Sequence, residues 1–209
     1  MSAKGRPKRE VLPPGGKARS AKGAPVSTVD PYLKIDKYHA PQWLGSRGTR
    51  RFHVMAKPAG SACNLDCTYC FYLSKQSLPG GPGGGHMSEE ILESFIRDYI
   101  ESVTADEVVF SWQGGEPTLM GIGFFEKVVA LQTKHAKPGQ RIAYDLQTNG
   151  TLLDVDWARF LKARNFLVGL SIDGPREIHD HYRITKRGEP TFDAVCNAAH
   201  TLRRFGVRY

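Results

Sequence analysis

The chain has few cysteines and no long apolar stretch, and these two absences exclude several classes of protein. Only four of its 209 residues are cysteine, and three of these are clustered, so the pattern is not a disulfide framework. No apolar run approaches the roughly 18–20 residues that cross a bilayer, and no apolar segment of the secretory type follows the basic N-terminus. Clustered, unpaired thiols are typical of a reducing compartment, so we expect a cytoplasmic location and no membrane attachment.

Acidic residues are scarce in the first quarter of the chain. Residues 1–51 contain twelve Lys and Arg but only three acids, a net charge of +9, and the remainder carries a net charge of −1. Residues 1–40 are rich in Lys, Arg, Gly, Pro, Ala and Ser, so we expect a basic, disordered tail over 1–49 and a folded domain over 50–209. Tethering of nucleic acid or an acidic membrane by the tail is the alternative. The neutral remainder has no electrostatic footprint for nucleic acid.

Three of the cysteines, Cys63, Cys67 and Cys70, lie within eight residues. Cys thiolates hold iron–sulfur clusters, and three of them can ligate three irons of a 4Fe–4S cluster and leave the fourth iron open. A structural zinc site, the alternative, requires four ligands in closed tetrahedral geometry. The fourth cysteine, Cys196, lies far along the chain in a predicted helix, where we expect it to be a small buried hydrophobe. A cluster with an open iron is therefore the favoured interpretation.

Extended and helical patterns alternate from Arg50 onward. Apolar segments predict strands at 52–56, 107–112, 141–147 and 166–172, and a Gly/Pro-rich loop is predicted from 79 to 85. We predict a first helix N-capped by Ser88 with an apolar stripe from Ile91 to Ile100, and further helices at about 124–135, around 157–161 and at 191–205. The pairs Phe124/Phe125 and Trp157/Phe160 are expected in the core. This order predicts an α/β fold with a parallel sheet and right-handed crossovers.

Each predicted strand is followed by a loop with distinctive residues. These loops contain the three cysteines, Gly114-Gly115-Glu116-Pro117, residues 147–150 and residues 171–175. In a parallel α/β barrel such loops gather at the C-terminal face of the strands, where active sites are built. The sequence therefore predicts one composite site.

The cysteine spacing resembles that of the radical S-adenosylmethionine (SAM) superfamily. Residues 57–72, 112–118, 147–150 and 171–183 together resemble the anaerobic sulfatase-maturating enzymes (SPASM type) more specifically, and the likeness covers roughly residues 52–209. It implies a partial (β/α)6 radical-SAM barrel, of which about four βα units are present here, followed by a domain with two auxiliary 4Fe–4S clusters. Because the chain stops at Tyr209, where a fifth strand would begin after Gly206, we expect a fragment or a truncated chain without turnover of its own.

The resemblance also implies roles for individual residues, while the catalytic base is left unassigned. Cys63, Cys67 and Cys70 would hold a 4Fe–4S cluster whose open iron binds SAM, which reduction splits into methionine and a 5′-deoxyadenosyl radical. The remaining roles concern SAM. The backbone carbonyls of Gly114 and Gly115, with Glu116 nearby, would accept hydrogen bonds from the SAM ammonium, and Arg183 would pair with the SAM carboxylate. Tyr69 would lie against the adenine, and Ser171 would donate to a ribose hydroxyl.

Plainer interpretations stay open for these residues. They are a simple turn for the glycines, a core aromatic for Tyr69 and a solvated arginine for Arg183. Gln113, Gln147 and Asn149 could line the pocket, or they could simply form turns, as amide side chains at strand ends often do. His179 and His181 are expected in a solvated loop and not as metal ligands.

The implied function is oxidation of a Cys or Ser in an unfolded sulfatase polypeptide to formylglycine. It requires a reductant such as ferredoxin or flavodoxin. One alternative keeps the radical chemistry but acts on a ribosomally made peptide. The other is a truncated, non-catalytic chain whose basic tail binds nucleic acid or a partner.

Overall fold

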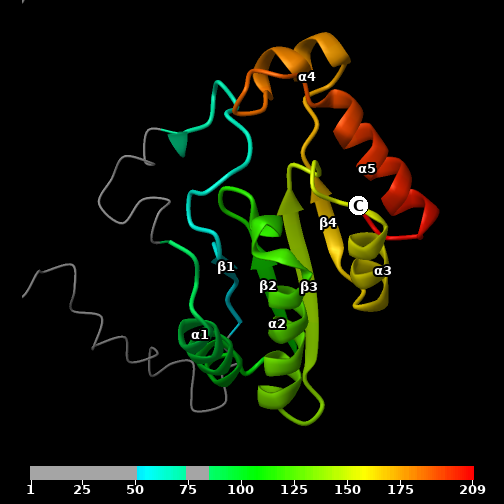
Figure 1. The fold of residues 1–209 in the computed structure, drawn as a ribbon. Coiled ribbons are helices and arrows are strands. Elements are labelled where there is room, and N and C mark those ends of the chain that lie inside the picture. The colour runs from blue at the N-terminus through cyan, green and yellow to red at the C-terminus, as the bar shows by residue number, and fades with distance from the viewer. Residues whose placement is uncertain (1–50, 74–84) are drawn as a thin grey trace, which may run out of the picture. The chain divides into compact units, whose positions relative to one another are not determined.

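The sheet consists of four parallel strands in the order β1-β2-β3-β4 (Figure 1). In the computed structural model, residues 51–73 and 85–209 are described, all within one compact unit that spans 48–209. The strands are β1 Val54–Ala56, β2 Glu107–Trp112, β3 Arg141–Thr148 and β4 Leu167–Leu170. The predicted parallel α/β fold is confirmed. The predicted tail at 1–49 and most of the loop at 79–85 lie outside the described residues.

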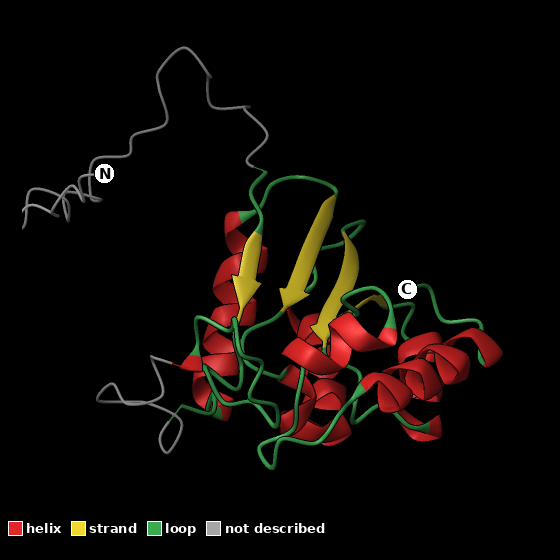
Figure 2. Cartoon of the chain, turned by 90° about the horizontal axis from the view of Figure 1, so that it is seen from above, coloured by secondary structure: helices red, strands yellow, loops and turns green. Residues whose placement is uncertain are grey.

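Helices follow the strands. They are α1 Glu89–Ser102, the 3-10 helix η4 Pro117–Met120, α2 Gly121–His135, α3 Val155–Ala163, α4 Arg176–Tyr182 and α5 Phe192–Arg204. Helices α1, α2, α3 and α5 pack on one side of the sheet, and α4 lies beyond the carboxyl ends of the strands (Figure 1 and Figure 2). Among the described residues, no helix has the length and apolarity needed to cross a membrane.

Two of the helices, α1 and α3, begin with a side-chain N-cap. The Ser88 hydroxyl accepts from the backbone N–H of Ile91, as predicted, and the Asp154 carboxylate accepts from the first turn of α3. Ile91, predicted as the first residue of the apolar stripe, is 59% exposed, so this part of the prediction is wrong. Leu92 and Ile96, further along the stripe, are fully buried.

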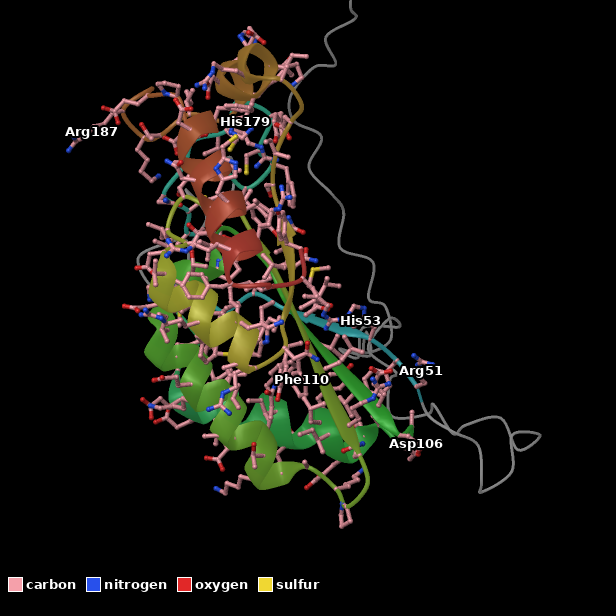
Figure 3. The ribbon with its side chains drawn as sticks, turned by 90° about the vertical axis from the view of Figure 1, so that its right-hand side faces the viewer. Arg51, His53, Asp106, Phe110, His179 and Arg187 are labelled. Carbon is pink, nitrogen blue, oxygen red and sulfur yellow. The ribbon has the colours of Figure 1, made fainter. Side chains whose placement is uncertain are left out.

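The core lies between the sheet and the helices. Every second residue of β2, namely Val108, Phe110 and Trp112, points into this core and is almost fully buried. The residues between them face the other side of the sheet. Figure 3 shows the two sides, with the helices on one and His53 on the other. The aromatic pairs predicted in the core are confirmed, because Phe125 and Trp157 are buried and their neighbours Phe124 and Phe160 pack against them.

Three element predictions differ from the structure. The first strand, predicted at 52–56, begins only at Val54. The fourth strand ends at Leu170 and not at Ile172, because the chain turns towards Gly174, whose φ is +81°. Residues 176–182, predicted as loop, form α4 directly after Pro175, with Glu177 favourably placed in its first turn. The predicted start of a fifth strand after Gly206 agrees with the structure, because Arg208 forms a parallel bridge with Leu167 of β4.

Candidate functional site

One pocket brings together residues from the loops after all four strands. Its volume is about 210 Å³ and its lining includes Cys63, Cys67 and Cys70. The predicted residues that join the cysteines in this lining are Tyr69, Gln113, Gly114, Gly115, Gln147, Asn149, Ser171 and Arg183. The composite site predicted at the carboxyl ends of the strands is thus present. Glu116 is not part of the lining.

Backbone and side-chain N–H groups point at a cysteine sulfur in this pocket. Cys63 Sγ accepts from the N–H of Leu65 at 3.4 Å and from Asn149 Nδ2 at 3.7 Å. Burial raises the pKa of the Cys63 thiol, and these two hydrogen bonds offset part of the rise. Burial also raises the pKa of Cys67, against the positive charge of Arg183. Hydrogen bonds to sulfur are among the features that set the potential of iron–sulfur clusters.

The arrangement of the thiols favours a cluster over a single ion. Among the described residues, no three His, Cys, Asp or Glu side chains converge to hold one metal ion. Zinc ligated by thiolates requires such convergence, with Zn–S distances of about 2.3 Å. Three thiolates that each ligate a different iron need only surround a common space, and the pocket provides that space. The donor set therefore fits a 4Fe–4S cluster.

The Gly-Gly-Glu loop after β2 is fastened to the cysteine loop. The N–H of Gly115 donates to Gly60 O at 2.9 Å, and that of Glu116 donates to Ala62 O at 2.8 Å. A Cβ at Gly115 would lie 2.0 Å from Ala62 O, and one at Gly114 (φ +119°) would lie 2.8 Å from Gly60 O. Both positions therefore require glycine for contact between the two loops, a reason that the sequence did not reveal.

Glu116 lies outside the pocket lining, with its carboxylate hydrogen-bonded to neighbouring loops. Its side chain is fully buried, and Oε1 accepts from the N–H and hydroxyl of Thr118 and from the hydroxyl of Thr148. Oε2 accepts from the N–H of Asn149 at 2.7 Å. The carboxylate therefore joins the loop after β2 to the loop after β3. Contact between Glu116 and the SAM ammonium remains a prediction, and the described contacts of the carboxylate are all within the protein.

Tyr69 and Arg183 meet at Asp173, on the rim of the pocket. Arg183 forms a bidentate pair with the Asp173 carboxylate, at 2.9 and 3.0 Å, and Tyr69 Oη donates to it at 2.7 Å. The Arg183 guanidinium also lies 5.6 Å from the centroid of the Tyr69 ring. Arg183 is thus not the solvated arginine of the alternative interpretation, since only 16% of its side chain is exposed. Its pairing with a SAM carboxylate remains a prediction.

These contacts shift the ionisation of the three groups. Burial alone would raise the pKa of Asp173, but the hydrogen bonds from Arg183 and Tyr69 outweigh it and hold that pKa below its usual value. Burial, followed by the hydrogen bond to Asp173, raises the pKa of Tyr69. Asp173 is therefore a carboxylate and Tyr69 a neutral phenol near neutral pH.

Ser171 and Gln147 are neighbours across β3 and β4. Gln147 Nε2 donates to Ser171 Oγ at 3.0 Å. A Cβ on Gly169 would lie 2.1 Å from Gln147 Oε1, so this glycine makes room for the amide beside the pocket.

A second amide network joins the cysteine loop to the loop after β3. Asn149 Nδ2 donates to Asn64 Oδ1 at 2.8 Å, and Asn64 Nδ2 donates to Thr151 Oγ1 at 2.8 Å. The sequence placed Asn149 in the pocket but gave no signal for Asn64 or Thr151.

The loop predicted for His179 and His181 is wrong, because both residues are on α4. The solvation predicted for His179 is also wrong, since it is completely buried, whereas His181 is solvent-exposed as predicted. Burial, and then the positive charge of Arg183, lower the pKa of His179, against the acidic Asp180 and Asp173. Cys196, predicted to be buried on α5, is half-buried.

The pattern of the radical SAM superfamily matches residues 58–209. The chain therefore belongs to this superfamily, whose members use a 4Fe–4S cluster and SAM. It is 45% identical to a serine-type anaerobic sulfatase-maturating enzyme of Bacteroides thetaiotaomicron over 157 residues, which are 75% of this chain and 38% of that protein. It is also 45% identical to a cysteine-type enzyme of Clostridium perfringens over 156 residues, 75% of this chain and 42% of the relative.

Solved structures show the same relationship. Native anSMEcpe with bound AdoMet and Cp18Cys peptide has a TM-score of 0.68 and 44% identity, covering 75% of this chain and 41% of the other. The complex with the Kp18Cys peptide has a TM-score of 0.69 and 46% identity over 75% of this chain and 41% of the other. The predicted partial radical-SAM barrel is confirmed, and the chain spans about 40% of the length of these relatives.

Proposed function

We propose that this protein is a radical SAM oxidoreductase that converts a Cys or Ser of an unfolded sulfatase polypeptide to formylglycine. The pocket that unites three clustered thiols with the glycine loop is the observation that carries the proposal. Its specific substrate rests on similarity to both serine-type and cysteine-type sulfatase-maturating enzymes. Because the chain is equally identical to the two types, either target residue is compatible with the proposal.

In this proposal Cys63, Cys67 and Cys70 hold the cluster, and the remaining pocket residues bind SAM. When bound, the cluster and SAM supply a 5′-deoxyadenosyl radical that can remove a hydrogen atom from the Cβ of the target residue. Cys63 is oriented by the N–H groups that donate to its sulfur. Arg183 lines the pocket and would pair with the carboxylate of SAM through the guanidinium N–H groups that Asp173 does not use.

The chain's own contribution is to orient the bound groups and keep water away. Gly114 and Gly115 line the pocket, and their missing Cβ atoms let this loop contact the cysteine loop, so their carbonyls would be available to the SAM ammonium. The buried carboxylate of Glu116 fixes that loop by accepting hydrogen bonds from the backbone N–H groups of Thr118 and Asn149. Tyr69 supplies an aromatic face at the rim for the adenine ring, and Ser171 a hydroxyl for the ribose.

The proposal includes a reductant of the ferredoxin or flavodoxin type and a cytoplasmic location. Cluster chemistry requires low-potential electrons, and reduced thiols persist in the cytosol. Modification of an unfolded polypeptide also fits a compartment in which the sulfatase has just been synthesised.

The test uses the full-length protein, anaerobically reconstituted, with dithionite, SAM and two peptides that carry a sulfatase target segment with Cys or Ser. We expect SAM cleavage together with the mass change of formylglycine in at least one peptide. Cys67→Ala should abolish both, whereas Cys196→Ala, on α5 and outside the pocket lining, should retain them. Cleavage of SAM with both peptides unchanged would reject the sulfatase substrate, and modification of a short ribosomal precursor peptide instead would support the alternative.

A further inference from the structure

His179 is the buried centre of a hydrogen-bond network behind the pocket rim. It is 0% exposed, and Figure 3 shows it at the end of the sheet opposite Asp106, which precedes β2. Its Nδ1 accepts from the backbone N–H of Asp173 at 3.3 Å, and its Nε2 lies 3.0 Å from the hydroxyl of Thr191. The ring also packs edge-on against Phe192, with centroids 5.6 Å apart.

The neighbouring donors determine which ring nitrogen carries the proton. The single hydrogen of the Thr191 hydroxyl is donated to Arg183 O at 2.7 Å. Thr191 Oγ1 can therefore only accept from the ring, so Nε2 is the donor. A backbone N–H faces Nδ1, so this atom must be the acceptor. His179 is consequently a neutral Nε2–H tautomer with both ring nitrogens satisfied.

Two restraints on Arg183 pass through the His179 ring, one by way of Thr191 and one by way of Asp173. Arg183 O accepts from the Thr191 hydroxyl, which His179 orients. The backbone N–H of Arg183 donates to His179 O at 2.7 Å as the C-cap bond of α4, which does not depend on the His179 side chain. The Arg183 side chain is fixed by the Asp173 carboxylate. The backbone of Asp173 is in turn fixed by His179 Nδ1.

We propose that His179 is a positioning residue for the SAM pocket: it sets the place of Asp173 and Arg183 on the rim without touching the ligand. His179 is absent from the pocket lining, whereas Arg183 and Tyr69, the two partners of the Asp173 carboxylate, are part of it. Fixing a guanidinium before the ligand arrives lowers the ordering cost of binding. The inference rests on the proposed SAM site. It adds to that site a residue outside the pocket lining that fixes the position of two residues on the rim.

The test compares His179→Phe with His181→Phe in the reconstituted chain, with SAM itself as the probe. Phenylalanine keeps an aromatic ring against Phe192 but removes both hydrogen bonds. His181, two residues further along the same helix, is exposed and is a matched control. We expect His179→Phe to raise the Kd for SAM about tenfold, which corresponds to about 1.4 kcal/mol, with unchanged iron content. Saturating SAM should restore the cluster's spectral response.

Thr191→Val and Thr191→Ser test the same network by another route. Valine removes the hydroxyl that joins His179 to Arg183 while keeping the shape, so the Kd for SAM should rise, and serine should restore it. If His179→Phe does not fold, this pair decides, and equal SAM affinity of the two Thr191 variants overturns the inference. Equal Kd values for His179→Phe and His181→Phe also overturn it. A wild-type chain that holds its cluster but binds no SAM refutes the proposed SAM site itself, and the inference with it.

Discussion

Substitution of Gly115 by alanine should separate the cysteine loop from the loop after β2. The new Cβ would lie 2.0 Å from Ala62 O and 2.6 Å from Ala62 C. Both neighbours are backbone atoms, so no side-chain rotation relieves the clash. One of the two loops has to move, and with it the frame that holds Cys63.

The magnitude follows from two contributions. Overpacking of this kind costs about 1–3 kcal/mol. Separating the loops also loses the hydrogen bonds from Gly115 N to Gly60 O and from Glu116 N to Ala62 O, about 1 kcal/mol each. The free energy of unfolding should therefore fall by about 3–5 kcal/mol, a large part of the roughly 5–15 kcal/mol of a typical domain.

Anaerobic denaturant unfolding and iron content per chain measure the two consequences. The control is Gly123→Ala on α2, where no atom lies within 4 Å of the added Cβ. There alanine should raise stability by about 0.5–1 kcal/mol, because it favours the helix. Equal stability and equal iron content of Gly115→Ala and the wild type would refute the loop-contact argument.

Three further predictions address the carboxylate, the histidine and the thiols. Glu116→Gln should lower the free energy of unfolding by about 1–3 kcal/mol, because an amide N–H₂ replaces one acceptor of a fully buried group. Denaturant titration measures this change, and an unchanged unfolding midpoint would contradict the prediction. The folded-state pKa of His179 lies below its ordinary value of 6.5, so the unfolded chain binds more protons there and stability should fall as the pH drops from 7 to 5; His179→Gln should flatten this part of the pH profile relative to His181→Gln, and parallel profiles would reject the assignment. Cys67→Ala should abolish cluster uptake while Cys196→Ala retains it, as shown by iron content and visible absorption; uptake in both variants would place the cluster elsewhere.

Much of the fold could be predicted because the local signals agreed with the tertiary structure. Apolar segments such as 107–112 form strands, and the Ser88 cap starts its helix. The end of β4 was predicted too late, because Ser171 keeps one backbone bond to Thr148 but leaves the ladder. The short helix α4 was missed because it has no apolar period, only a proline before it and an acid in its first turn.

The sequence predicts which residues belong to the site, but not which contacts they make with one another. Spacing identified the thiols and the glycine loop, since these residue types have few other uses in such patterns. The sequence does not reveal the partners of the Glu116 carboxylate, Thr118, Thr148 and Asn149, because two of them lie at the end of another strand and directly after it. Nothing local marks His179 as buried, because its two partners come from separate segments that only folding brings together.

Electron paramagnetic resonance of the reconstituted, dithionite-reduced chain, with and without SAM, tests the central claim most directly. The claim is that the loops after the four strands assemble both the cluster and its SAM pocket. It predicts a reduced 4Fe–4S signal that shifts when SAM is added. A signal indifferent to SAM, or no cluster signal in a correctly folded chain, would contradict it.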